Sequence, residues 1–104
     1  MGKPHIHAGS SVKHFGGSPQ DYLKIHQFID QSATTFGDLR HRALTHTQWF
    51  LREILPLKFG DTIKNSDGRL VSVVEIGEQH VLEDYGGKFI PAVADFLQEM
   101  ELTA

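Results

Sequence analysis

The hydrophobic pattern of this sequence changes from helical to strand-like spacing between Pro56 and Gly60, and this change limits the folds open to it. Before Pro56, apolar residues recur at spacings of three and four, which is typical of amphipathic helices. After Gly60, two short β-branched segments at 62–64 and 70–74 flank the turn-forming residues 65–68. The sequence therefore predicts a mainly α fold, a small four-helix domain with a β-hairpin insert between helices 2 and 3.

The first two helices are predicted from capping residues and apolar spacing. The first is expected over residues 18–32, because Ser18 can cap it and Pro19 suits the first helical position. The second is expected over residues 38–55, with a broad apolar face that suggests a central place in the fold. It should end before Pro56, because the residue that precedes a proline is disfavoured in the α conformation.

The remaining elements follow from glycine and proline. A third helix is expected over residues 75–85, ended by Gly86 in the left-handed conformation. A last helix should begin at Pro91 and run through Met100. Residues 1–17 lack a sustained apolar period and are expected to form an extended N-terminal arm. The whole chain, 1–104, fits a single domain, since domains most often have about 100–150 residues.

Composition excludes several classes of protein. The chain has no cysteine, so disulfides, thiol nucleophiles and cysteine-ligated zinc are excluded, and a reducing, cytoplasmic location is expected. Its net charge of −3 argues against broad nucleic-acid binding. No apolar run approaches the roughly 20 residues of a membrane helix, and the N-terminal segment lacks the apolar core of a secretory signal.

Histidine is the residue type that stands out, with seven in 104 residues. Two histidines have a carboxylate four residues later: His26 precedes Asp30, and His80 precedes Asp84. Residues four apart lie on the same side of a helix, so each pair offers two metal ligands, or one ligand and the carboxylate that orients it. Imidazole and carboxylate groups suit divalent zinc, manganese, nickel or iron.

His46 is the third histidine predicted to bind a metal. It lies at the edge of the apolar face of the second helix, where a side chain meets a partly buried site, whereas His41 faces the more solvated side. The predicted metal ligands are His26, His46, His80, Asp30 and Asp84. If the chain is an enzyme, we expect metal-assisted hydrolysis with Glu78 or Glu53 as the general base.

Two alternatives stay open at this point. His5 and His7 alternate in the N-terminal segment and could bind a metal from an extended chain, although histidine clusters near termini are commonly incidental. Alternatively, the histidines are structural and the chain is a non-catalytic interaction protein, with a homodimer as the expected assembly. A homodimer or a pocket is expected to cover Trp49, which lies beside the apolar face of the second helix. Convergence of the predicted histidine ligands on one point would favour the metal site.

Three segments carry a resemblance to a known family: RHRALTH at 40–46, NSDGR at 65–69 and IGEQHVLED at 76–84. Over most of its length the chain resembles a family of small uncharacterised bacterial and phage domains, a domain of unknown function, which implies no particular activity. It has a looser similarity to HD-type metal phosphohydrolases, helical proteins whose site is built from the pattern His…His-Asp…Asp. This chain has no His-Asp dipeptide.

Overall fold

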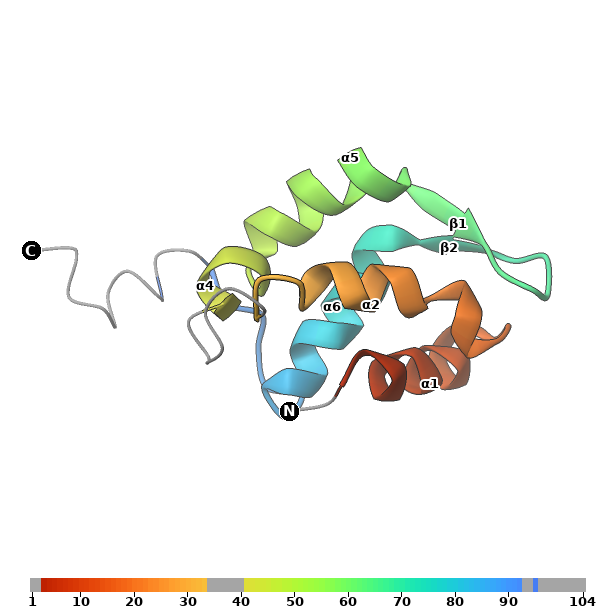
Figure 1. Ribbon diagram of the computed structural model, residues 1–104, viewed down its shortest axis with the longest axis horizontal. Helices are drawn as coiled ribbons and strands as arrows, with labels where there is room; N and C mark the ends of the chain where they lie inside the picture. Colours follow the sequence, from red (N-terminus) through yellow and green to blue (C-terminus); the bar gives the residue numbers. More distant parts are fainter. Residues whose placement is uncertain (1–2, 34–40, 93–94, 96–104) are drawn as a thin grey trace, which may run out of the picture.

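A computed structural model describes residues 3–33, 41–92 and 95 of the chain. In this part, helices predominate and an antiparallel hairpin lies at one end, which confirms the predicted mainly α fold with a hairpin insert (Figure 1). The elements are α1 (Pro4–Phe15), η1 (Pro19–Asp21), α2 (Leu23–Ile29), α4 (His41–Thr45), η2 (Phe50–Ile54), α5 (Leu55–Phe59), β1 (Thr62–Lys64), β2 (Leu70–Ser72) and α6 (Val73–Asp84).

The N-terminal segment is helical, so the extended arm expected over residues 1–17 is wrong. Helix α1 begins at Pro4, whose missing N–H costs nothing in the first helical turn. Its buried face consists of His7, Ala8 and Ser11. A search for apolar spacing misses this helix, because the side that packs on the protein is polar or small.

The second predicted helix differs from the structure at both its middle and its end. The chain bends at His46 and Thr47, and then continues helically through η2 and α5 as far as Phe59. The expected end at Pro56 is therefore wrong. Pro56 lacks an N–H and its ring crowds the preceding turn, and the wider π-helical turn η2 directly before it accommodates both effects. The predicted start at residues 38–40 lies outside the described residues.

The hairpin connects the two halves of the chain. Strands β1 and β2 are antiparallel, with Ile63 opposite Val71. The second strand is shorter than predicted, because Ser72 already caps α6: its hydroxyl accepts a hydrogen bond from the backbone N–H of Glu75. Most of the last predicted helix, from Pro91 to Met100, lies outside the described residues.

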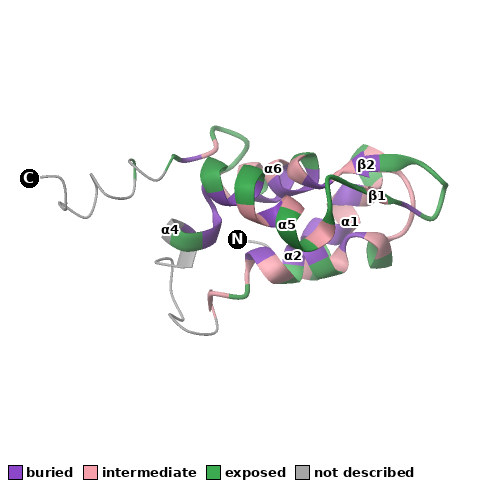
Figure 2. Cartoon of the chain, turned by 90° about the horizontal axis from the view of Figure 1, so that it is seen from above, coloured by how far each residue is buried: buried purple, intermediate pink, exposed green. Residues whose placement is uncertain are grey.

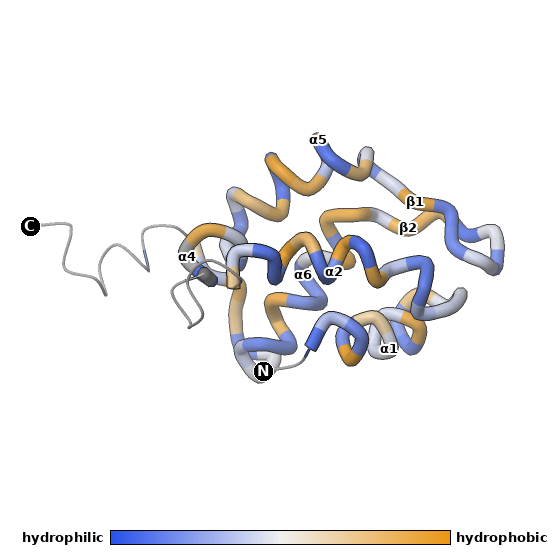
Figure 3. The backbone as a smooth tube through the Cα atoms, in the orientation of Figure 1, coloured by the Kyte–Doolittle hydropathy of each residue, from blue (hydrophilic) through white to orange (hydrophobic). Residues whose placement is uncertain are grey.

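Helix α6 is central, since it contacts α1, α2, α5 and η2. Figure 2 shows buried residues along these helices, with exposed residues on their outer sides, and Figure 3 shows apolar residues gathered in α5 and around α6. The hydrophobic core consists of Ala8, Tyr22, Ile25, Ile29, Phe50, Leu51, Leu55, Val71, Val73, Ile76 and Val81. Among the described residues, no helix is long and apolar enough to cross a membrane.

Candidate metal centre

The candidate site is a group of histidine and aspartate side chains from residues at or near the ends of α2, α4 and α6. Asp30 directly follows α2 and His46 directly follows α4, whereas His80 and Asp84 occupy the last two turns of α6. Both histidines are fully buried. The bend after α4 is what places His46 here, so the departure from a continuous helix positions the site.

The distances within this group are close to those between ligands of one metal ion. The ligand atoms of Asp30, His46, His80 and Asp84 all lie within 4.8 Å of one another. His46 Nε2 lies 2.9 Å from Asp84 Oδ2 and 3.3 Å from Asp30 Oδ1. His80 Nε2 lies 3.1 Å from Asp30 Oδ1 and 3.4 Å from Asp84 Oδ2. Bonds of about 2.0–2.2 Å to a common ion place neighbouring ligand atoms roughly 3 to 3.5 Å apart.

His7, on α1, also lies next to this group. From the sequence, His7 was considered as a metal ligand only together with His5 on an extended chain. His7 Nε2 lies 3.2 Å from Asp84 Oδ1, yet both atoms are buried without a hydrogen-bond partner. Buried polar atoms without partners are unfavourable, and a shared cation would satisfy both. In the sequence, the four-residue spacing of His7 and Ser11 was the pattern that could have indicated a helix with both residues on its buried side. We call His7, Asp30, His46, His80 and Asp84 the five-residue cluster.

The second ring nitrogen of each cluster histidine is held by a neighbour. His7 Nδ1 lies 2.8 Å from Glu83 Oε1, and because a carboxylate can only accept, the Nδ1–H donates. His46 Nδ1 lies 2.9 Å from Thr45 Oγ1. A histidine that binds a metal through one nitrogen is commonly oriented through the other in this way.

His26, a predicted ligand, lies behind His80 instead of within the five-residue cluster. Its Nδ1 is 2.9 Å from His80 Nδ1, and its Nε2 is 2.7 Å from Ser11 Oγ. Both ring nitrogens of His26 are therefore engaged away from the aspartates. Its place in the structure is that of a residue that orients His80.

The hydrogen bonds of Ser11 determine where the proton of His26 lies. Gln79 Nε2 is 3.2 Å from the His7 carbonyl and 2.8 Å from Glu83 Oε1, both acceptors, so the amide nitrogen faces them. Gln79 Oε1 then faces Ser11, whose other oxygen neighbour is also the His7 carbonyl. The single hydroxyl hydrogen of Ser11 goes to one of these oxygens. Ser11 Oγ must therefore accept a hydrogen bond from Nε2–H of His26.

This proton arrangement continues to His80. Burial, together with the nearby His80 and His7 rings, lowers the pKa of His26 to about 3, so His26 is neutral at pH 7. Because its Nε2 carries the hydrogen, its Nδ1 accepts and His80 Nδ1 donates. The Nε2 of His80 faces Asp30 and Asp84, and a neutral His80 presents a lone pair to them. That arrangement requires a cation, either a proton or a metal ion.

The electrostatics of the five-residue cluster lead to the same requirement. Burial opposes ionisation of Asp30 and Asp84, but hydrogen bonds from the surrounding histidines outweigh it and hold both carboxyl pKa values below their ordinary range. Burial also lowers the pKa of His7 and His46, but the facing carboxylates raise it above the ordinary value. The two buried carboxylates thus favour positive charge on the facing histidines, and a divalent cation would supply such charge.

Neither predicted general base reaches the five-residue cluster. Glu53 is exposed on η2, and Glu78 lines a separate cavity of about 570 Å³ on the outer side of α6. Within the described part of the chain, no contact joins either carboxylate to the cluster. Their catalytic role stays a prediction. The side chain of His41 lies outside what the structure describes.

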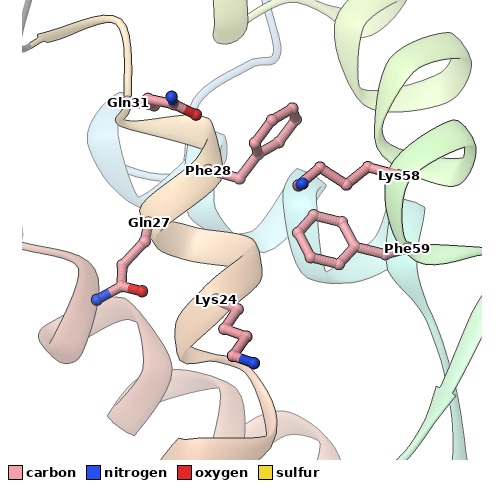
Figure 4. A pocket seen from close by; sticks show the side chains of 6 residues that line it. All are labelled: Lys24, Gln27, Phe28, Gln31, Lys58 and Phe59. Carbon is pink, nitrogen blue, oxygen red and sulfur yellow. The ribbon is translucent and has the colours of Figure 1, made fainter.

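A further cavity, of about 420 Å³, lies between α2 and α5 (Figure 4). Phe28 and Phe59 both line it and meet edge to face, with ring centres 5.6 Å apart. The ammonium of Lys58 lies 5.3 Å and 5.9 Å from the centres of these two rings. The lining residues are Lys24, Gln27, Phe28, Gln31, Lys58 and Phe59. Since none of them belongs to the five-residue cluster, this cavity is separate from the candidate metal centre.

Comparison with known proteins confirms the expected domain of unknown function. No curated protein and no solved structure matches the chain. A family model, described as a domain of unknown function (DUF6915), matches residues 2–104. Because this match extends over nearly the whole chain, the protein belongs to the DUF6915 family.

Proposed function

We propose that this protein is a metalloprotein whose five-residue cluster binds one divalent transition-metal ion. The observation that carries the proposal is the convergence of ligand atoms from Asp30, His46, His80 and Asp84 within 4.8 Å. His7 supports it, because its buried Nε2 faces the same aspartate without a hydrogen bond. Two carboxylates would balance the charge of the ion.

The donor set restricts which ions fit. Three imidazoles and two carboxylates, with no thiolate, suit zinc, manganese, nickel or iron, whereas calcium and magnesium prefer oxygen ligands alone. Five protein ligands leave a six-coordinate ion one position for an external molecule. Metal sites that keep a position open are typical of catalysis, whereas structural zinc sites are closed.

We infer metal-assisted hydrolysis as the class of reaction. A bound divalent cation would supply Lewis acidity toward a substrate oxygen. The side chain of Asp30 is 18% exposed, whereas those of Asp84, His46 and His80 are at most 1% exposed, so a substrate reaches the centre along Asp30. Glu83 and His26 keep the rings of His7 and His80 oriented toward the aspartates.

Thermal melting of chelator-treated protein titrated with zinc, manganese and nickel tests the metal site. An ion that binds only the folded protein adds about 2.7 kcal/mol at one hundred times its Kd. His7→Ala, His46→Ala and His80→Ala should each abolish the shift in Tm. His5→Ala is the matched control, because His5 is exposed on the same helix as His7. A shift that survives changes in the cluster would contradict the proposal.

Metal-dependent turnover tests the reaction class separately. Chromogenic phosphate and carboxylate esters should be hydrolysed by the metal-loaded protein and not by the chelator-treated protein. The His46→Ala variant should be inactive in the presence of the same ion. Full metal binding without hydrolysis of either ester would leave the metal site intact and count against the hydrolase.

A non-catalytic interaction protein is the second candidate, and the exposure of Trp49 favours it. This side chain is 56% exposed, which is unusual for the one tryptophan of a small domain. If the protein forms a homodimer through this surface, light scattering should show twice the chain mass, and Trp49→Ser should return it to the monomer. A monomeric wild type would contradict the homodimer.

A further inference from the structure

Arg42 is a buried residue whose guanidinium has no acidic partner among the described residues. The residue is 8% exposed, and its Nε is buried with no hydrogen-bond partner. In the part of the chain that the structure describes, no carboxylate forms an ion pair with it; its neighbour is the ring of Tyr85, whose centre lies 4.9 Å from Cζ. Burial of an unpaired charge is strongly unfavourable, so this guanidinium needs an anion that the described residues do not provide.

The position of Arg42 relates it to the five-residue cluster. Arg42 lies one helical turn before His46, whose backbone N–H donates to the Arg42 carbonyl. Tyr85 directly follows Asp84. The α4 segment and the end of α6 therefore lie side by side. Two contacts connect them: His46 with Asp84, and Arg42 with Tyr85. Arg42 thus lies one helical turn from a residue of the five-residue cluster, on a segment that packs against the end of α6.

We propose that Arg42 is the anion-binding residue of this centre and that the substrate carries an oxyanion, a phosphate or carboxylate group, which contacts the metal ion and Arg42 together. This inference rests on the metal site proposed above. Asp30 and Asp84 balance a divalent ion, which leaves the charge of Arg42 for the substrate. The planar guanidinium suits two oxygens of one anion, and the Tyr85 ring, centred 4.9 Å from Cζ, adds a cation–π contact.

The experiment uses manganese-loaded protein, with inorganic phosphate and acetate as the two probes. Calorimetry gives the Kd of each anion, and the water-proton relaxation of the bound manganese reports whether the anion reaches the ion. Arg42→Met removes the charge at similar volume, and Arg42→Lys keeps the charge without the planar fork. Arg52→Met is the matched control, because Arg52 is exposed on η2.

We expect Arg42→Met to bind manganese as the wild type does and the preferred anion at least about thirtyfold more weakly, as when one partner of a buried charge pair is removed. The anion affinity of Arg42→Lys should lie between those of the wild type and Arg42→Met. The anion affinity of Arg52→Met should match that of the wild type. The anion that binds more tightly to the wild type identifies the substrate group as phosphate or carboxylate.

The possible failures are distinguishable. Manganese binding without anion binding, or equal anion affinity in the wild type and Arg42→Met, overturns the role of Arg42 and leaves the metal site standing. Absence of manganese binding by the wild type overturns both proposals. If Arg42→Met does not fold, Arg42→Lys decides: weaker anion binding at unchanged manganese affinity supports the role, and unchanged anion binding overturns it.

Discussion

Nδ1 of His26 lies 2.9 Å from Nδ1 of His80, and this contact between two buried rings determines which nitrogen of His80 faces the aspartates. Because Ser11 can only accept from Nε2–H of His26, the Nδ1 of His26 is an acceptor and His80 must donate to it. The Nε2 of His80 is thereby directed at Asp30. A residue outside the five-residue cluster thus prepares one of its ligands.

Replacement of His26 should weaken metal binding without removing a ligand. His26→Phe deletes the acceptor for His80 Nδ1, and loss of such an outer hydrogen bond typically costs about 10–100-fold in metal affinity. His26→Asn is the conservative control, because an amide oxygen close to the position of Nδ1 can still accept. Calorimetric titration with zinc measures both variants, with circular dichroism as the check on folding. Equal zinc affinity in His26→Phe and the wild type would remove the orienting role.

Metal binding should release protons and strengthen as pH rises. Burial opposes protonation of His7 and His46, but their carboxylate neighbours raise both pKa values, so these rings bind protons more tightly than an ordinary histidine and an ion competes with those protons. A raised pKa stabilises the metal-free fold below the unfolded value near 6.5, and this stabilisation is lost as pH rises through the folded pKa. The metal-induced shift in Tm should therefore grow between about pH 6 and pH 8.

Calorimetry in buffers with different ionisation enthalpies checks this release directly. The apparent binding enthalpy should depend on the buffer, and the slope should show protons leaving the protein. A binding enthalpy that is the same in all buffers, or a metal-induced Tm shift that does not change with pH, would contradict protonated histidines in the cluster.

Gly77 should be required for the packing of α6 on α5. A Cβ at this position would lie 2.6 Å from Leu55 Cδ1 and 2.8 Å from Leu51 Cδ2. Gly77→Ala should therefore lower the free energy of unfolding by about 1–3 kcal/mol, as overpacking does. Gly9 is the control, because it lies within α1 and a Cβ added there would meet no atom within 4 Å, so Gly9→Ala should stabilise by about 0.5–1 kcal/mol. Urea denaturation measures the free energy of unfolding of both variants. A Gly77→Ala variant as stable as the wild type would contradict this packing.

The parts of the fold with apolar spacing or turn chemistry could be predicted from the sequence. The hairpin around residues 65–68 forms as expected, and the broad apolar face expected within residues 38–55 contributes Phe50, Leu51 and Leu55 to the core. Helix α1 could not be found in this way, because its buried side carries His7 and Ser11, which resemble the polar residues of a loop. Pro56 was misjudged because the π-helical turn before it is a local adjustment that spacing does not encode.

The candidate site, like the fold, could be predicted from the sequence only in part. The four-residue spacing of His80 and Asp84 on one helix was visible, and the structure brings both into the five-residue cluster. His26 and Asp30 share the same spacing, but only Asp30 reaches the cluster, since the ring of His26 turns toward Ser11. Which member of a pair faces a site depends on packing between helices, and neighbours distant in sequence decide it.

Anomalous diffraction from crystals of the metal-loaded protein is the most direct test of the metal centre. We expect one peak per chain, bonded at about 2.0–2.3 Å to Nε2 of the cluster histidines and to carboxylate oxygens of Asp30 and Asp84. The Nδ1 of His80 should remain hydrogen-bonded to His26. A density map without a peak among these side chains, or with peaks confined to exposed histidines such as His5 and His14, would contradict the metal centre.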